Sequence, residues 1–222
     1  MTHLLDSIVI DTAPYPQFSV IWMHGLGDSG EGWAPIVNEL DLQGLPGIRF
    51  IFPHANQMPV TINGGYVMRS WYDIVHTDLG RQEDEKGLRE SQILVEALIA
   101  REIARGVPAN RIVLGGFSQG CAMTLQAGLR YGQKLAGLMC LSGYVPLAEK
   151  VATERHPANQ ETPIFMVHGT MDPVIPFGRA TASRDLLAQL GYQIEWHEYP
   201  MQHSACAEEV QDVSAWLKKV LL

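Results

Sequence analysis

The clearest chemical signal in this sequence is a serine set between glycines, in the run Gly116-Phe117-Ser118-Gln119-Gly120. The apolar run from Arg111 to Phe117 predicts a β-strand before it, and a helix is expected from Ser118 to Tyr131. A serine in such a sharp strand-to-helix turn presents its hydroxyl at the carboxyl end of the strand. The two glycines are needed because side chains there would collide with the neighbouring strand and helix. We therefore predict that Ser118 is a nucleophile.

A nucleophilic serine of this kind needs an acid and a base, which follow it along the chain on loops after later strands. His203 lies between the last predicted strand, Gln193 to Tyr199, and the last helix. The other histidines after Ser118 lie within a strand, in a polar connection, or too early to leave a strand for the acid. His203 is therefore the predicted base, which takes the proton of the Ser118 hydroxyl.

The acid is expected after the predicted strand from Pro163 to Gly169, where Asp172 stands. Competing carboxylates fall within a helix or a strand, or precede that strand. An isolated aspartate would be read as a turn residue or a helix cap, but the order serine, acid, histidine favours Asp172 as the acid that orients His203. No metal or organic cofactor is required by this chemistry, and the histidines lack the HExxH spacing of a metallohydrolase.

The negatively charged oxygen of an acyl-transfer transition state needs two backbone donors aimed at it. One is predicted to be the amide of Gln119, directly after the nucleophile. The other is assigned to Leu26, in the loop His24-Gly25-Leu26-Gly27-Asp28 that follows a predicted strand. This loop lacks the lysine of a phosphate-binding P-loop and the GxGxxG spacing of a dinucleotide site.

Short β-rich runs alternate with helical patterns along the chain, and apolar runs without alternation indicate strands that are covered on both faces. Strands are expected at Phe18 to His24, Ile48 to Pro53, Arg111 to Phe117, Gly137 to Ser142, Pro163 to Gly169 and Gln193 to Tyr199, with an edge strand at Ser7 to Asp11. Helices are expected at about Gly32 to Leu40, Glu83 to Arg105, Ser118 to Tyr131, Gly178 to Leu190 and Cys206 to Leu222. The predicted fold class is α/β, with a mostly parallel central sheet between two layers of helices.

The 222 residues are expected to form a single domain over 1–222, because the chain is too short for two ordinary ones. A net charge of −8 disfavours nucleic acid and anionic lipid as partners. No export signal or bilayer-length apolar run is seen, so a cytoplasmic location without stable membrane association is expected. The segment from His54 to Gly80 fits neither periodicity, and its aromatic residues lead us to expect an irregular wall or lid over the site.

The motifs together resemble the carboxylesterase and acyl-protein thioesterase family of α/β-hydrolases over almost the whole chain. The likeness rests on the runs described above, on Leu141-Ser142-Gly143, on His168-Gly169-Thr170-Met171-Asp172, and on Pro59-Val60-Thr61 and Ser70-Trp71-Tyr72-Asp73-Ile74. By this resemblance Ser118, Asp172 and His203 form a triad, Leu26 and Gln119 supply the oxyanion amides, and Trp71 and Tyr144 bind the acyl group. It also implies a homodimer, which composition neither supports nor excludes.

One position departs from the family pattern. After Leu141-Ser142 the thioesterase members carry a small residue and then Trp, whereas this chain has Gly143-Tyr144. A smaller and more polar ring changes which acyl chain fits. For Trp71 an alternative stays open, because a tryptophan in a loop can simply anchor that loop in the core.

Three functions follow from these residues. The main hypothesis is a serine carboxylesterase that hydrolyses esters with small to medium acyl chains through an acyl-serine intermediate. The alternative is an acyl-protein thioesterase or lysophospholipase acting on long acyl chains, favoured by apolar residues of the irregular segment such as Val60, Ile62 and Tyr66. A remote alternative is an inactive hydrolase fold that serves as a binding module. In the first two the partner is a small-molecule ester or acyl substrate.

Overall fold

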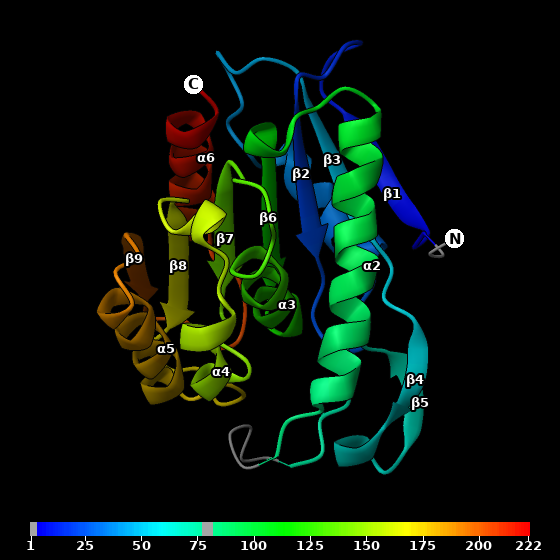
Figure 1. The fold of residues 1–222 in the computed structure, drawn as a ribbon, viewed down its shortest axis with the longest axis vertical. Helices are drawn as coiled ribbons and strands as arrows, with labels where there is room; N and C mark the ends of the chain where they lie inside the picture. The colour runs from blue at the N-terminus through cyan, green and yellow to red at the C-terminus, as the bar shows by residue number, and fades with distance from the viewer. Residues whose placement is uncertain (1–3, 77–81) are drawn as a thin grey trace.

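The computed structural model describes residues 4–76 and 82–222 (Figure 1). Its strands are β1 (Ser7–Asp11), β2 (Phe18–Met23), β3 (Ile48–Pro53), β4 (Gln57–Val60), β5 (Tyr66–Arg69), β6 (Ile112–Phe117), β7 (Gly137–Leu141), β8 (Ile164–Gly169) and β9 (Ile194–Tyr199). Its α-helices are α1 (Gly30–Trp33), α2 (Glu85–Ala104), α3 (Gln119–Gly128), α4 (Ala148–Glu154), α5 (Phe177–Gln189) and α6 (Ala207–Leu221).

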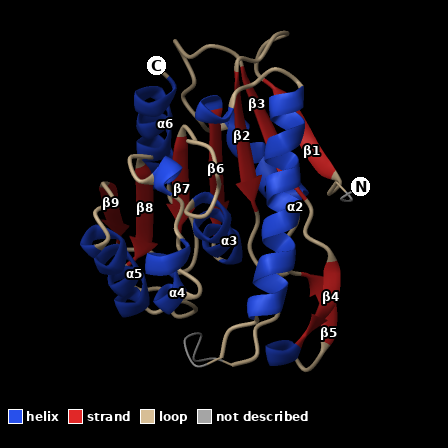
Figure 2. Cartoon of the chain, in the orientation of Figure 1, coloured by secondary structure: helices blue, strands red, loops and turns tan. Residues whose placement is uncertain are grey.

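The described strands include a seven-stranded sheet in the order β1-β3-β2-β6-β7-β8-β9 (Figure 2). All neighbouring pairs are parallel except β1 and β3, so the expected edge strand at Ser7–Asp11 is present and antiparallel. The predicted fold class is confirmed. Because the parallel strands point the same way, their carboxyl ends gather at one edge, where the predicted site residues were expected to meet.

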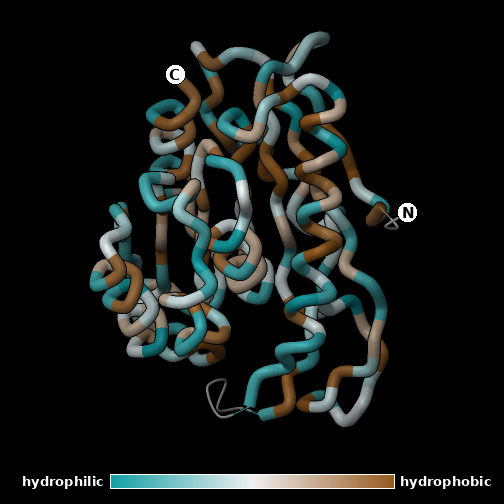
Figure 3. Tube along the Cα trace, in the orientation of Figure 1, coloured by the Kyte–Doolittle hydropathy of each residue, from teal (hydrophilic) through white to brown (hydrophobic). Residues whose placement is uncertain are grey.

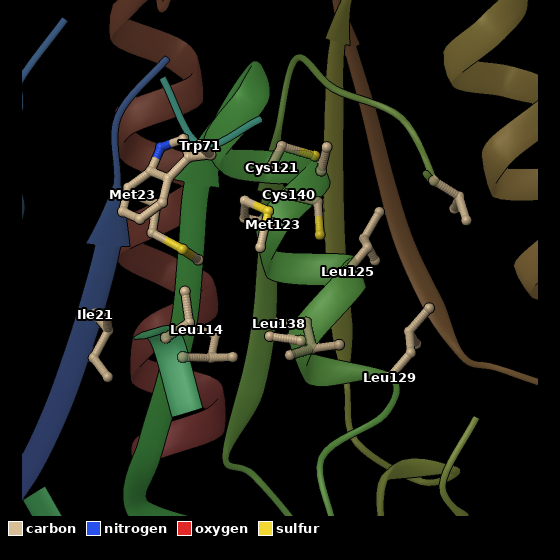
Figure 4. Packing of buried hydrophobic residues seen from close by; sticks show 14 of the residues in the cluster. Ile21, Met23, Trp71, Leu114, Cys121, Met123, Leu125, Leu129, Leu138 and Cys140 are labelled. Atoms are coloured by element: carbon tan, nitrogen blue, oxygen red, sulfur yellow. The ribbon is translucent and has the colours of Figure 1, made fainter. Parts of the chain in front are cut away.

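The inner strands of the seven-stranded sheet supply side chains to two separate cores because successive residues point to opposite faces. In β2, Ile21 and Met23 belong to a core shared with α2 and α3, whereas Val20 and Trp22 belong to a core shared with α6. Figure 4 shows Met23 beside Trp71 and Ile21 further along β2, in a cluster that also holds Leu114 of β6 and residues of α3 and β7. The sheet is thus covered on both faces, which explains its apolar runs without alternation.

Hydrophilic and hydrophobic residues alternate along the outer helices in Figure 3, whereas every residue of α3 is buried. In α6 the buried residues include Val213, Trp216 and Leu217, while Lys218 and Lys219 lie on its outer side. Across residues 4–76 and 82–222, no helix combines the length and the apolar character that crossing a bilayer would need.

The observed helices differ from the predicted ones at two places. The helix expected at Gly32 to Leu40 begins earlier, as the short α1, and continues as a 3₁₀ helix over Ala34–Asn38. Pro35 lacks an N–H and cannot join a regular α-helical ladder, which accounts for the change. Helix α4 was not predicted at all, because it is only seven residues long and follows Leu147 in a left-handed conformation (φ 47°).

The segment from His54 to Gly80 was expected to be irregular, which is wrong for its central part. Strands β4 and β5 pair as an antiparallel hairpin, closed by a 3₁₀ turn and by Gly64 and Gly65, both with positive φ. Figure 1 shows this hairpin beyond the carboxyl ends of the sheet strands. It is joined to the loop after β2, since the N–H of Gly27 donates to the carbonyl of Arg69 (2.8 Å). Residues 77–80 of the segment lie outside the described residues.

Candidate active site

Ser118 stands alone between β6 and α3, with φ 56° and ψ −116°. This strained conformation is held because the Ser118 N–H donates to the carbonyl of Leu141 on β7 (2.8 Å). A Cβ on Gly116 would lie 2.5 Å from the backbone of Gly120, and one on Gly120 would lie 2.1 Å from the carbonyl oxygen of Met23. The two glycines are therefore required by close approach of α3 and β2, as the motif predicted.

Ser118, His203 and Asp172 are brought together from three loops. The Nε2 atom of His203 lies 2.8 Å from Oγ of Ser118, and its Nδ1 atom lies 2.6 Å from Oδ2 of Asp172. Asp172 follows β8 and His203 follows β9, and the parallel strands end at the same edge of the sheet. The arrangement has the geometry of a nucleophile, a base and an orienting acid.

The other carboxylate oxygen of Asp172 is also satisfied. Its Oδ1 atom accepts hydrogen bonds from the backbone N–H groups of Val174 (2.8 Å) and Ile175 (2.9 Å). The Asp172 side chain is fully buried, whereas the His203 side chain is 16% exposed. The imidazole also packs on Phe117, with ring centroids 4.8 Å apart. A fixed carboxylate and a fixed ring are what proton transfer between Ser118 and His203 needs.

A second histidine supports the acid, and sequence reasoning had only excluded it as the base. His168, at the end of β8, has its Nε2 atom 2.8 Å from the carbonyl oxygen of Ile175 and 3.4 Å from Oδ2 of Asp172. Burial lowers the pKa of His168, so its ring is neutral and donates to that carbonyl. It fixes the loop that presents Asp172 without competing for its charge. The run His168-Gly169 at the strand end, just ahead of Asp172, was the available signal.

The loop assigned to the oxyanion is held by hydrogen bonds around its backbone. His24 is completely buried, and burial lowers its pKa, so the ring is neutral. The N–H of Ala55 donates to Nε2 of His24 (3.0 Å), which places the ring proton on Nδ1, 2.7 Å from the carbonyl oxygen of Gly25. A Cβ on Gly25 would lie 3.3 Å from Cβ of Ser118, so this loop runs directly beside the serine.

The backbone amide of Gln119 belongs to the first turn of α3, where N–H groups lack intrahelical acceptors. Its side chain has a separate use. Oε1 accepts from the backbone N–H of Trp71 (2.9 Å), and Nε2 donates to the carbonyl of Tyr72 (2.7 Å) and to Oγ of Ser70 (3.0 Å). Gln119 thereby ties the segment after the β4–β5 hairpin to the nucleophile turn.

Two cavities meet at Ser118. One, of about 610 Å³, lies on the His203 side and is lined by Trp33, Phe117 and Gly25 among others. The other, of about 430 Å³, lies on the Gln119 side. Its walls include the side chains of Ile62, Tyr72, Ile74, Tyr144, Pro173, Ile175 and Pro176. Leu26, Ser118 and Val174 line both cavities and so form the boundary between them.

The structure places the two predicted acyl-binding rings differently. Tyr144 lines the cavity on the Gln119 side. Trp71 lines neither cavity: it is 2% exposed, and its Nε1 donates to the carbonyl of His24 (2.9 Å). Figure 4 shows its indole beside Met23 in the core. Tyr72, the next residue, lines the cavity instead. Trp71 packs in the core and anchors its loop there.

Comparison with known proteins gives the family. The model of the phospholipase/carboxylesterase family matches residues 6–221. Acyl-protein thioesterase 1 of Yarrowia lipolytica is 44% identical over 206 residues, covering 90% of this chain and 91% of the relative. Acyl-protein thioesterase 1 of Neurospora crassa is 46% identical over 212 residues, covering 91% and 86%.

Solved structures agree with these relatives. Arabidopsis thaliana SOBER1 superposes with a TM-score of 0.88 at 34% identity, covering 92% of this chain and 99% of the other. Zea mays acyl-protein thioesterase 2 superposes with a TM-score of 0.87 at 26% identity, covering 98% and 99%. The resemblance noted in the sequence is confirmed by a family match over nearly the whole chain. This protein belongs to the phospholipase/carboxylesterase family of α/β-hydrolases, and it is a hydrolase.

Proposed function

We propose that this protein is a serine thioesterase that removes long acyl chains, through an acyl intermediate on Ser118. This reverses the order of the hypotheses drawn from the sequence, in which a carboxylesterase for small to medium acyl chains came first. The curated relatives named acyl-protein thioesterase 1 favour the long-chain alternative. The structural observation that best supports long acyl chains is the largely apolar cavity of about 430 Å³ that begins at Ser118.

The volume of this cavity supports a long chain. A water molecule occupies roughly 30 Å³ of liquid, and a methylene group is of similar size, so the cavity has room for about a dozen methylenes. Burying each of them contributes about 0.8 kcal/mol. An acyl chain of that length would gain most of its binding energy here, whereas an acetyl or butyryl group would leave most of the cavity unused.

The two cavities divide the substrate according to the chemistry. His203 must protonate the departing thiolate or alkoxide, so the leaving group belongs on its side, in the larger cavity. The acyl chain then occupies the cavity beside Gln119. A thiol on a protein or a lipid-like alcohol then projects from the leaving-group cavity, while the acyl chain lies in the other cavity.

The residues act in a fixed order in this mechanism. His203 takes the proton of Ser118 as its oxygen attacks the acyl carbon, while Asp172 stabilises the imidazolium that forms. The amides of Leu26 and Gln119 stabilise the oxyanion. The imidazolium then gives its proton to the leaving group, and a water activated by the same histidine hydrolyses the acyl-serine.

A ladder of acyl thioesters and matched oxygen esters, from acetyl to palmitoyl, tests this proposal. We expect kcat/KM to rise with chain length, and the rise to be retained below the concentrations at which the substrates aggregate. Ser118→Ala should abolish turnover and labelling by a fluorophosphonate, whereas Ser7→Ala, on the edge strand β1, should leave both unchanged. A maximum at acetyl or butyryl would restore the small-ester hypothesis, and wild-type protein that neither turns over nor labels would favour a binding module.

A further inference from the structure

Two tyrosine side chains meet in the wall of the proposed acyl cavity. The hydroxyl oxygens of Tyr72 and Tyr144 lie 2.8 Å apart, and the two residues are only 2% and 3% exposed. Burial raises the pKa of Tyr144 to about 12 and the pKa of Tyr72 well above its usual value. Both phenols are therefore neutral hydrogen-bonding groups at any physiological pH.

This pair has one donor hydrogen more than it uses. A phenol carries one O–H donor and can also accept, so a single bond between two phenols consumes only one of their two hydrogens. Among the described residues, the other hydrogen of the Tyr72–Tyr144 pair finds no acceptor. A buried donor without an acceptor is unfavourable, and an oxygen on a bound acyl chain would satisfy it.

The pair stands where a ligand can reach it. Tyr72, Ile74 and Tyr144 line both the acyl cavity and a much smaller one of about 10 Å³, whose other walls include Glu83 and His76. They form the partition between the two. Away from the reaction centre, the wall of the acyl cavity is otherwise apolar except for Asn63. The tyrosine pair is thus a polar spot in an apolar passage.

The charges behind the pair favour a neutral partner over an anion. The guanidinium of Arg179 lies 4.0 Å from the centre of the Tyr144 ring and 3.8 Å from the carboxylate of Glu83. The two opposite charges offset one another, so little net charge faces the partition. A carboxylate at the end of the acyl chain would lose its water shell there without gaining an ion pair. A hydroxyl or keto oxygen needs only a hydrogen-bond donor, and the tyrosine pair has one to offer.

We propose that this cavity prefers acyl chains that carry a neutral oxygen, as a hydroxyl or keto group, at the depth of Tyr72 and Tyr144. The chain oxygen accepts the hydrogen bond that the pair leaves unmade, and an unsubstituted chain of equal length leaves that donor unsatisfied. The inference rests on the proposed function, because it takes this cavity to be the one that holds the acyl chain.

A positional series of thioesters tests the preference. All members have the same chain length, and a hydroxyl or keto group is moved along the chain one carbon at a time. For the wild-type protein we expect kcat/KM to exceed that of the unsubstituted chain by about tenfold at one or two adjacent positions, the effect of one hydrogen bond. A ratio of one or less at every position would overturn the proposal.

The double variant Tyr72→Phe/Tyr144→Phe keeps the ring volumes and removes both hydroxyls. We expect it to lose the preference and to hydrolyse the unsubstituted chain faster than the wild type. The matched control is Tyr15→Phe, since Tyr15 is 88% exposed and lines neither of the two cavities, and it should keep the wild-type ratio. A preference that survives in the double variant would show that the oxygen is recognised elsewhere, and would overturn the assignment to this pair.

Binding measurements separate this inference from the proposed function. Calorimetric titration of the Ser118→Ala variant with the free hydroxy, oxo and unsubstituted acids needs no turnover and no tyrosine variant. The best oxygenated acid should bind about tenfold more tightly. Equal dissociation constants would refute the subsite even if thioesters are hydrolysed, and tighter binding would support it even if thioesterase activity is absent or the double variant fails to fold.

Discussion

His24 donates a hydrogen bond of 2.7 Å from Nδ1 to the carbonyl oxygen of Gly25. That carbonyl shares its peptide plane with the N–H of Leu26, the proposed oxyanion donor. The C=O and N–H of a trans peptide point in opposite directions, and the described residues contain no cis peptide. By holding the oxygen, His24 therefore sets the direction of the Leu26 N–H. From the sequence, His24 was the first residue of the loop assigned to the oxyanion, without a role of its own.

Replacing His24 should misdirect this donor. We expect His24→Leu to lower kcat by about 10- to 100-fold with little change in KM, less than the 10²–10³ that follows outright loss of an oxyanion donor. His24→Asn keeps a nitrogen donor near the Gly25 carbonyl and should recover most of the rate. Steady-state kinetics and inhibition by an alkyl boronic acid, whose adduct carries a charged oxygen, measure this. A rise in KM with kcat unchanged would show that His24 contributes to substrate binding and not to stabilisation of the transition state.

The acid of the proposed triad gives a second prediction. In Asp172→Asn an amide can still accept from the N–H groups of Val174 and Ile175, but it then presents N–H to His203 in place of an oxygen. The imidazole is left in the wrong tautomer, and kcat should fall by about 10³–10⁴. Single-turnover acylation measures the effect directly. A fall of less than tenfold would mean that another group orients His203.

Two glycines in different helices, Gly120 of α3 and Gly178 of α5, predict opposite effects on stability. Gly120→Ala puts a Cβ 2.1 Å from the carbonyl oxygen of Met23, and we expect a loss of about 1–3 kcal/mol or more in the free energy of unfolding. Gly178→Ala, in α5, meets nothing within 4 Å and should gain about 0.5–1 kcal/mol from helix propensity. Urea titrations of both variants give the comparison, and equal midpoints would contradict the close approach of α3 to β2.

Glu209, in the first turn of α6, is 1% exposed, and neither of its carboxylate oxygens completes a hydrogen bond within the part of the chain that the structure describes. Burial raises its pKa to about 8, and the nearby backbone amide of Cys206 offsets this only in part. The folded protein therefore keeps a proton that the unfolded chain loses near pH 4.5. This group lowers the free energy of unfolding as pH rises from about 4.5 to 8, by about 3–5 kcal/mol in all.

Glu209→Gln removes this titration. Relative to the wild type, its free energy of unfolding should increase steadily between pH 5 and 8 and then level off, as measured by urea denaturation at each pH. Glu208→Gln, the exposed neighbour in the same helix, should follow the wild type at every pH. If the difference in free energy of unfolding between Glu209→Gln and the wild type stays constant across this range, folding does not raise the pKa of Glu209.

The geometry of the site was largely predictable, because the order of strand ends in a parallel sheet decides which loops meet. Ser118, Asp172 and His203 each follow a strand, and finding them required only the order of elements and the residue types. Their roles in catalysis remain proposals that the experiments above address.

What the sequence could not show was which of two neighbours faces the cavity. Trp71 and Tyr72 are both aromatic and adjacent, and they lie outside any helix or strand. No helical or strand periodicity in the sequence therefore indicates which side chain points toward the cavity. Which ring faces the cavity depends on Gln119, whose side chain binds the backbone N–H of Trp71 and the backbone carbonyl of Tyr72.

The β4–β5 hairpin was missed because its strands have only four residues each, include Pro59 and contain few β-branched residues, which gives too weak a pattern.

The boundary formed by Leu26, Ser118 and Val174 has a kinetic consequence. If the proposed thioester substrate is divided between these two cavities, the thiol leaves while the acyl half stays in place, and water then reaches the ester on Ser118 through the emptied space. Release would be ordered, thiol first and fatty acid last. For the longest chains the slow event would be withdrawal of the free acid, so the enzyme would show a burst of thiol followed by a slower steady rate.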